Sequence, residues 1–316
     1  MKCFMKNKKI FLLGATGQIG KELALELQNY NNINFLCHSR TQVGSSFFDY
    51  YNIKNIVGEI SEENIISEIK DADLIFDLAA PDSGTLKEIK NFYKKRINLV
   101  IPNMKENSKY VFASTMNAYG IDRRRKVLKN YFFSSSIYSS NKRFAENYIN
   151  KISRENGIKA YLLRLGEVHG KLQRASLNII KLISDRRIFE IPKSPAWITF
   201  ISLIRDTIMN ITLDKEKPGL YTMVCDDILW SELLNTLSEK TGDKAKYFFS
   251  EPKKNISELK KEIYNILDKY KDFIRGNFEI SKKYEDKIKL NYRINKIKGL
   301  ENSNINNKVY REYNRY

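Results

Sequence analysis

The sequence predicts an α/β protein built on a doubly wound parallel sheet, with a smaller C-terminal part. Short apolar runs alternate with helical patterns over the first two-thirds of the chain, as in successive β-α-β units with right-handed crossovers. A glycine-rich stretch, GATGQIG, lies between the first apolar run and the first helical pattern. A strand-to-helix turn of this kind is typical of doubly wound sheets.

Six apolar runs predict the strands of the sheet. Each is short and bounded by polar or turn-forming residues, as expected for strands of this class. In chain order they are residues 9–13, 34–38, 54–60, 73–80, 109–114 and 159–165.

Apolar residues at helical spacing predict the connecting helices. Residues 18–30 form the first helix, and a helix capped by Ser61 runs to Lys70. Residues 136–156 form a long helix before the sixth strand. After residue 166 the alternation weakens, and we expect strands at 197–204 and 220–224 and a helix at 231–240.

Three parts follow from this pattern. Residues 1–165 form the doubly wound domain, which a strand near 197–206 is expected to complete. Residues 166–250 form a smaller second part. Residues 251–316 are a basic extension with apolar residues at helical spacing over 256–274. Packing on the core is the default role of the extension, and dimerisation or contact with a membrane surface stays open.

Composition limits the function classes. The chain has 316 residues and a formal net charge of +18, which favours anionic partners such as nucleotides, nucleic acid or acidic lipid; the alternative is simply a lysine-rich solvated surface. Three scattered cysteines and two histidines predict no disulfide framework, no metal site and no histidine-based triad. Apolar runs are too short for a membrane span or a secretory signal, so we expect a cytoplasmic protein.

GATGQIG predicts a dinucleotide site. Its glycines allow a tight turn and a close approach of backbone N–H groups to a pyrophosphate, and the following helix N-terminus favours negative charge. The residues expected to contact the dinucleotide here are Gly14, Thr16, Gly17, Gln18, Ile19 and Gly20.

The residues at the end of the second predicted strand indicate which dinucleotide binds. An NAD site normally has an acidic residue there for the ribose 2′-hydroxyl, but no Asp or Glu occurs between Glu26 and Asp49. Ser39 and Arg40 occupy that position, and a guanidinium can pair with a 2′-phosphate. We therefore expect NADP as the preferred cofactor and keep NAD as the alternative.

A catalytic group is predicted on the long helix. Tyr138 and Lys142 are four residues apart and share a helix face. A lysine ammonium near a phenol is expected to lower the tyrosine pKa and make Tyr138 an acid/base near neutral pH. The preceding strand ends in Ser114 and Thr115, at the strand ends where doubly wound sheets bind ligands.

These motifs resemble the extended short-chain dehydrogenase/reductases, in particular the NAD-dependent epimerase/dehydratase family that modifies nucleotide sugars. The resemblance covers about residues 8–242. It implies that residues 1–165 are an NAD(P)-binding domain of the Rossmann type and that residues 166–250 are the substrate-binding part. GATGQIG resembles the phosphate loop of the family, and FDLAA resembles its fourth-strand motif. FASTMNAYG resembles the strand that carries the catalytic residue, and AENY matches the rest of the catalytic helix. RLGEVHG resembles the beginning of the substrate part, FISLIRDTI resembles a later strand, and GLYTMVCDDILWSELL resembles the closing strand and helix.

The resemblance implies a mechanism and a set of site residues. A hydride would pass between a sugar carbon and the nicotinamide, with Tyr138 as acid/base, Thr115 assisting and Lys142 holding the ribose. It also implies cofactor contacts at Leu78, Ala79, Ala80 and Leu165, and substrate contacts at Ser114, Asn117, Glu167 and Arg174. A homodimer through the helix at 136–156 is an expectation of the same kind.

Three departures from the family pattern affect the expected chemistry. Thr115 is followed by Met116 and Asn117, whereas the dehydratases have carboxylates there, so dehydration is disfavoured. Glu167 stands where relatives commonly have Asn near the substrate diphosphate. Arg174, Arg186 or Arg187 would have to offset the repulsion, and the alternative for all three is plain surface charge. Residues 123–126 (RRRK) form a basic loop that either meets an anionic substrate or is simply solvated.

We therefore expect a keto-sugar reductase or an epimerase acting on a nucleotide sugar, in the synthesis of surface-polysaccharide precursors. The alternative is a non-catalytic relative that senses nucleotides or binds RNA. Because Thr115, Tyr138 and Lys142 are all present, we expect nucleic acid to be an unlikely partner.

Overall fold

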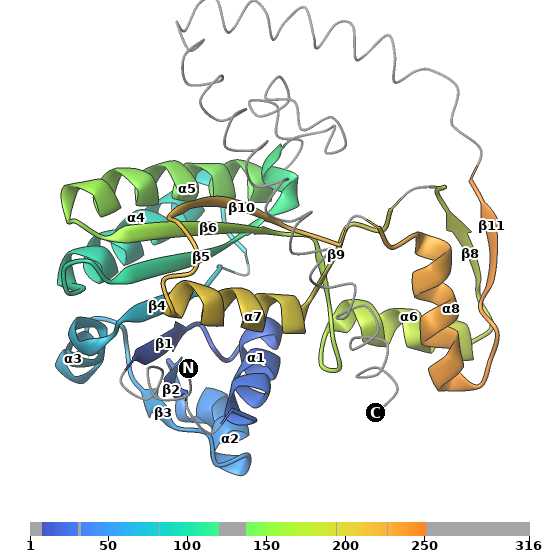
Figure 1. The fold of residues 1–316 in the computed structure, drawn as a ribbon, viewed down its shortest axis with the longest axis horizontal. Helices are drawn as coiled ribbons and strands as arrows, with labels where there is room; N and C mark the ends of the chain where they lie inside the picture. The colour runs from blue at the N-terminus through green and yellow to red at the C-terminus, as the bar shows by residue number, and fades with distance from the viewer. Residues whose placement is uncertain are drawn as a thin grey trace, which may run out of the picture.

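A seven-stranded parallel sheet forms the centre of the molecule (Figure 1). The computed structural model describes residues 8–30, 33–81, 83–119, 137–193, 195–225 and 227–250. The strand order is β10-β6-β5-β4-β1-β2-β3, and every neighbouring pair is parallel. The strands are β1 (Lys9–Leu13), β2 (Asn34–Ser39), β3 (Asn55–Val57), β4 (Leu74–Asp77), β5 (Lys109–Thr115), β6 (Lys159–Leu165) and β10 (Gly219–Met223).

Helices cover both faces of this sheet. Alternate residues of β1 enter two separate cores: Ile10 and Leu12 face one, and Phe11 and Leu13 face the other. Helices α1 (Gln18–Gln28), α2 (Gln42–Tyr50) and α7 (Ile201–Thr212) pack on the first face. The second face is covered by α3 (Glu63–Asp71), α4 (Leu86–Val100) and α5 (Ile137–Glu155). This is the predicted doubly wound, Rossmann-type architecture.

Strand order reverses beside β1, and this position determines where a ligand can bind. The chain passes from β1 outward to β2 and β3, then returns to place β4 on the other side of β1. Such a switch point leaves a crevice at the carboxyl ends of the strands. The β5 strand continues into the short 3-10 turn η2 (Met116–Tyr119), and a second such turn, η1 (Ile101–Asn103), follows α4.

A smaller part lies beside the sheet, at the right of Figure 1. It contains α6 (Arg174–Ser184), α8 (Trp230–Thr241) and the parallel pair β8 (Ile188–Ile191) and β11 (Lys246–Phe249). A second parallel pair, β7 (Glu167–His169) and β9 (Ile198–Phe200), joins it to the sheet. A separate apolar core, which includes Ile183, Leu233 and Leu237, holds the part together.

The expectation of a completing strand near residues 197–206 is wrong. Only Ile198–Phe200 is a strand, and it pairs with β7 outside the main sheet. From Ile201 the chain is helical, because Ile201, Ile204, Ile208 and Ile211 recur at helical spacing and are all buried. The strand that completes the sheet is β10, which pairs with β6.

Some predictions lie outside the described residues. They concern the basic loop at 123–126, Gly120 and the extension 251–316. Within the described part of the chain, no helix is both long and apolar enough to cross a bilayer.

Candidate functional site

The glycine-rich turn has the close backbone contacts that its sequence predicts. Gly14 has a φ of +71°, and a Cβ there would lie 2.7 Å from the backbone nitrogen of Ala79. A Cβ on Gly20 would lie 2.4 Å from the carbonyl oxygen of Ala15, so α1 packs directly on the turn. Gly17 precedes α1, and no side chain caps the helix there. The first N–H groups of α1 therefore stay available to an anion.

A cavity of about 310 Å³ opens beside this turn. It brings together twelve of the predicted site residues, which come from the turn, α1, the segment after β4, α5 and the ends of β5 and β6. They are Gly14, Gly17, Gln18, Ile19, Gly20, Leu78, Ala80, Ser114, Thr115, Tyr138, Lys142 and Leu165.

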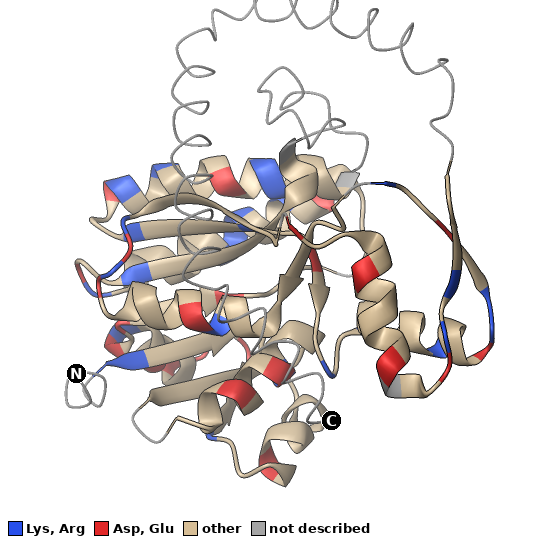
Figure 2. Ribbon diagram, turned by 45° about the vertical axis from the view of Figure 1, so that its right-hand side comes forward, with Lys and Arg blue, Asp and Glu red and all other residues tan. Residues whose placement is uncertain are grey.

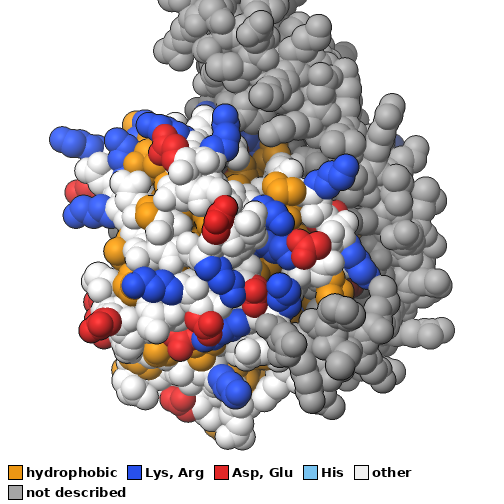
Figure 3. Space-filling view, turned by 60° about the vertical axis from the view of Figure 1, so that its left-hand side comes forward, with side chains coloured by type: hydrophobic (Ala, Val, Ile, Leu, Met, Phe, Trp, Pro, Cys, Tyr) orange, Lys and Arg blue, Asp and Glu red, His pale blue; other side chains and the backbone are white. Residues whose placement is uncertain are grey.

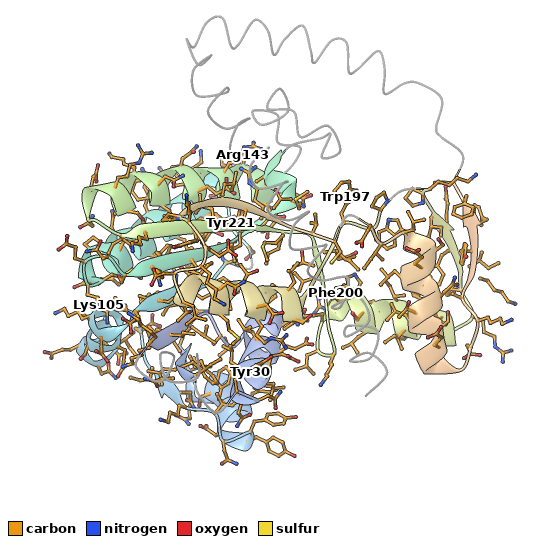
Figure 4. All side chains as sticks on the ribbon, viewed as in Figure 1. Tyr30, Lys105, Arg143, Trp197, Phe200 and Tyr221 are labelled. Carbon is orange, nitrogen blue, oxygen red and sulfur yellow. The ribbon has the colours of Figure 1, made fainter. Side chains whose placement is uncertain are left out.

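Three further lining residues, Ala113, Gly166 and Val168, were not predicted from the sequence. Ala113 is part of the apolar run of β5, so nothing in its type marks it. Gly166 could have been noticed as a glycine directly after a strand: a Cβ there would lie 1.9 Å from the carbonyl oxygen of Trp197. Figure 4 shows Trp197 and Phe200 at the junction between the sheet and the smaller part.

Other predicted residues do not line the cavity. Thr16 and Ala79 belong to the phosphate-loop neighbourhood, where Ala79 packs against Gly14. Ser39 is buried at the end of β2, and its hydroxyl donates to the Thr41 carbonyl at 2.8 Å. Arg40 is exposed beside it.

Thr115, Tyr138 and Lys142 meet at the carboxyl end of β5. The side chains of Thr115 and Tyr138 share a hydrogen bond. Lys142 lies one helical turn after Tyr138, with its Nζ 5.8 Å from the centre of the tyrosine ring. The ammonium donates to the carbonyl oxygen of Ala113 at 2.7 Å and lies 4.5 Å from the centre of the Phe112 ring. These contacts fix Lys142 against the strand that carries Thr115.

The expected lowering of the Tyr138 pKa is wrong for this arrangement. Desolvation by the surrounding protein raises the pKa of Tyr138 above its ordinary value near 10, although the residue is 49% exposed, and the hydrogen bond from Thr115 only partly offsets this. Burial also lowers the pKa of Lys142 to about 8, although Asp77 and Glu146 raise it. Because desolvation disfavours both charged forms, the tyrosine stays protonated at neutral pH.

A buried ion pair supports the end of β5. Arg164 and Glu146 are both almost completely buried, with distances of 2.9 Å from Arg164 Nε to Glu146 Oε1 and 2.5 Å from Nη2 to Oε2. Ser114 donates its hydroxyl to Glu146 Oε1 at 2.5 Å. Ser114 therefore lines the cavity but has its hydroxyl proton committed to this pair.

A second buried group lies at the end of β4. Asp77 accepts from Arg96 Nε at 2.8 Å and from the Tyr110 hydroxyl at 2.5 Å. Its other oxygen accepts from the backbone N–H of Ala79 at 3.0 Å. Asp77 thus fixes the segment that faces Gly14, and sequence reasoning gave it no role.

The other three residues predicted to contact a substrate, Asn117, Glu167 and Arg174, do not line the cavity. The backbone N–H of Asn117 donates to Thr115 Oγ1 at 3.2 Å. Glu167 is exposed, and its carboxylate lies 3.6 Å from His169 Nε2, which lowers the pKa of Glu167. Arg174 begins α6, and its backbone N–H donates to Gln18 Oε1 at 3.3 Å. Arg174 therefore lies next to the phosphate loop.

The ionisable groups in the cavity are few. Among the described residues that line it, only Tyr138 and Lys142 titrate, and none is Asp, Glu or His. Across the described ranges, no group of three or more His, Cys, Asp or Glu side chains could hold a metal ion. The arrangement combines an anion-binding turn with a phenol and an ammonium, which can move a proton next to a bound nucleotide.

The comparisons with solved structures agree with the fold. One similar structure is UDP-N-acetylglucosamine 4-epimerase from Bacillus cereus, with a TM-score of 0.63 and 17% identity over 77% of this chain and 85% of that one. Another is the ADP-L-glycero-D-manno-heptose-6-epimerase of Helicobacter pylori, with a TM-score of 0.61 and 16% identity over 78% and 86% of the two chains. MoeE5 in complex with UDP-glucuronic acid and NAD has a TM-score of 0.57 and 20% identity, covering 77% of this chain and 85% of that one.

A comparison with curated proteins finds no match. A family model does match: residues 10–186 fit the model of the NAD dependent epimerase/dehydratase family. This match covers more than half of the 316 residues and includes the glycine-rich turn, Thr115, Tyr138 and Lys142. The chain therefore belongs to the NAD dependent epimerase/dehydratase family.

Proposed function

We propose that this chain is an enzyme that exchanges a hydride between a nicotinamide dinucleotide and a carbon of a nucleotide-activated sugar. The observation that carries the proposal is that Thr115, Tyr138 and Lys142 line the same cavity as the glycine-rich turn. Four of the similar structures contain NAD, three of them together with UDP-glucuronic acid or UDP-glucose. A nucleotide sugar is therefore the substrate class to test first.

The residues around the turn fit a dinucleotide. The close contacts at Gly14 and Gly20 leave no room for a side chain, so the backbone can approach a pyrophosphate. Lys142 would donate to the nicotinamide-side ribose, and Leu78, Ala80 and Leu165 would pack along the dinucleotide. When bound, the nicotinamide supplies or accepts the hydride.

In this mechanism the protein's own residues move and hold the proton. The raised pKa of Tyr138 keeps its phenol protonated, so Tyr138 donates a proton to a sugar carbonyl oxygen as that oxygen becomes a hydroxyl. Thr115 holds the phenol and the substrate oxygen through its hydroxyl. A protonated Tyr138 suits the reduction of a keto-sugar, which needs a proton donor. An epimerase needs Tyr138 both to accept a proton and to donate it back in each catalytic cycle.

Dehydration is disfavoured by the composition of the cavity. It requires a carboxylate to take and return a proton at the neighbouring carbon, and no described lining residue is acidic. Met116, which directly follows Thr115, is buried, and a thioether cannot carry a proton. We therefore propose a reductase or an epimerase that supplies sugar precursors for surface polysaccharides.

The experiment combines binding with turnover. Melting curves in the presence of NAD, NADP, UDP-glucose and UDP-glucuronic acid should show stabilisation by a dinucleotide and by a UDP-sugar. Tyr138→Phe should lower turnover by about 100-fold or more and leave dinucleotide binding intact. Tyr148→Phe is the matched control, because Tyr148 lies on the same helix and its hydroxyl donates to Asn98. No stabilisation by either dinucleotide would refute the proposal.

A further inference from the structure

A buried carboxylate joins the phosphate-loop helix to the smaller part. Glu22 lies on α1 and is only 4% exposed. Its oxygens accept from the backbone N–H of Lys171 at 2.6 Å, the backbone N–H of Leu172 at 3.0 Å and Gln173 Nε2 at 2.7 Å. The three donors belong to the loop between β7 and α6, about 150 residues away in sequence.

The same loop also contacts the first turn of α1. Gln173 Nε2 donates to the carbonyl oxygen of Gln18 at 3.1 Å, and the backbone N–H of Arg174 donates to Gln18 Oε1 at 3.3 Å. Gly170 allows this approach, because a Cβ there would lie 2.3 Å from Glu22 Oε1. We call this contact between α1 and residues 170–174 the α1 joint.

The α1 joint connects two walls of the cavity. Gln18 and Gly20 line it from α1, and Gly166 and Val168 line it from the segment that leads into the 170–174 loop. The loop continues into α6, whose last turn enters the core of the smaller part through Ile183. A ligand that restrains the first turn of α1 therefore also restrains Gln18, which is hydrogen-bonded directly to the loop.

We propose that Glu22 is a positioning residue that couples dinucleotide binding at the phosphate loop to the order of the 170–174 loop, and so to nucleotide-sugar binding in the smaller part. This inference rests on the proposed function. Glu22 acts through the loop and through its own helix, and it contacts no reacting group. Because coupling between two sites is reciprocal, a nucleotide diphosphate in the smaller part would also strengthen dinucleotide binding.

The chemistry of the joint requires a carboxylate. A carboxylate offers acceptors on both oxygens, and here both are used by N–H donors. In Glu22→Gln one of these oxygens becomes an NH₂ group that faces an N–H donor and leaves it unpaired. A buried, unpaired donor is costly, so the loop should detach from α1 while the glycines of the phosphate loop remain in place.

Hydrogen exchange measured with and without a dinucleotide tests the coupling. In the wild-type protein, NADP or NAD should slow exchange of the Lys171 and Leu172 amides. In Glu22→Gln these amides should exchange about tenfold faster and no longer respond to the dinucleotide. Protection of residues 14–20 should be unchanged, and the dinucleotide Kd measured without UDP should change by less than about twofold. The Kd of the probe UDP, measured with saturating dinucleotide, should rise about tenfold, and UDP should no longer strengthen dinucleotide binding.

Glu26→Gln is the matched control. Glu26 lies one turn further along α1 and pairs with Arg205 of α7, within the main sheet domain. This variant removes the same charge from the same helix, yet it should keep the dinucleotide response of the 170–174 loop. If Glu22→Gln does not fold, Gly170→Ala perturbs the joint from the other side, because its methyl group meets the Glu22 carboxylate.

Two results would overturn the inference. In one, the loop responds to the dinucleotide in Glu22→Gln as it does in the wild type. In the other, Glu22→Gln weakens dinucleotide binding as much as UDP binding, which is the pattern of a purely structural residue. A wild-type protein that binds neither probe refutes the proposed function itself. A wild type that binds both without protecting the loop refutes only the coupling.

Discussion

Arg40 is the residue on which the choice between the two dinucleotides is expected to depend. It is exposed at the end of β2, next to the buried Ser39. NADP should raise the melting temperature more than NAD, and Arg40→Ala should remove that difference, because the guanidinium is the cation available to a 2′-phosphate there. Arg187→Ala, an exposed arginine in the smaller part, should leave the difference intact. Equal shifts by NAD and NADP in the wild type would contradict the preference.

Lys142 provides a test of pH dependence. Burial lowers its pKa to about 8 in the folded protein, whereas a lysine in the unfolded chain keeps its proton up to about pH 10. Between these two pH values the unfolded chain binds more protons. Protonation of Lys142 therefore stabilises the unfolded chain relative to the folded one. As pH rises through this window, this effect is lost and the free energy of unfolding increases.

The prediction compares Lys142→Met with the wild type by urea unfolding. At neutral pH the variant avoids the cost of burying an ammonium, so its free energy of unfolding should be higher relative to the wild type. This advantage should shrink by about 2 kcal/mol between about pH 8 and pH 10. Buried tyrosines with raised pKa values elsewhere in the sheet, such as Tyr161 and Tyr221, act in both proteins and cancel in the difference. A difference that does not change with pH would disprove the lowered pKa.

At the scale of elements, the glycines of the phosphate loop have separable roles. A methyl group on Gly20 would lie 2.4 Å from the Ala15 carbonyl oxygen, whereas on Gly17 its nearest neighbour is the Gly14 carbonyl oxygen at 3.5 Å. Gly20→Ala should therefore lower the melting temperature by about 5 °C or more. Gly17→Ala should fold almost normally but weaken dinucleotide binding about tenfold, since its methyl group enters the cavity.

Calorimetry and titration of the two variants provide the check. The expected pattern is a stability loss confined to Gly20→Ala and a binding loss in Gly17→Ala without a matching stability loss. If Gly17→Ala binds as the wild type does, the dinucleotide does not approach the turn as proposed.

The observed helices and strands also show which elements could be predicted from the sequence. Strands β1 and β6 begin and end where predicted, because each is a short apolar run with clear boundaries. The α4 helix was not predicted, although Thr85 and Glu88 form a capping box at its start, a signal that the sequence contains. Residues 201–204 were assigned to a strand because an apolar run does not distinguish a strand from a buried helix by itself.

The same limit applies to the site. Tyr138 and Lys142 could be predicted because their spacing on one helix is local. The contacts of Glu22 with the 170–174 loop could not, because they join segments far apart in sequence. The direction of the Tyr138 pKa was also missed, since it depends on burial, which only the folded structure shows.

At the scale of the whole molecule, the net charge of +18 raises the question of nucleic-acid binding. Lysines and arginines do not gather into one stripe on the described elements: they alternate with acidic residues along the ribbon (Figure 2) and over the face drawn in Figure 3. Several of these basic side chains form ion pairs near the N-terminal ends of the sheet strands. Lys9 Nζ lies 2.8 Å from Asp71 Oδ2, and Lys105 Nζ lies 3.0 Å from Asp73 Oδ1. Paired cations contribute little to phosphate binding.

We therefore expect a labelled single-stranded RNA to bind weakly at low salt, and to be released at about 0.15–0.2 M salt, because its binding would depend on counterion release. Dinucleotide binding should persist at that ionic strength, since it depends on the backbone of the glycine turn and on buried groups, which salt screens less. Fluorescence anisotropy with RNA and melting curves with NADP, measured in the same salt series, distinguish RNA binding from dinucleotide binding. Tight RNA binding in physiological salt, together with no response to a dinucleotide, would favour the non-catalytic alternative, because catalysis by Tyr138 requires the nicotinamide beside it.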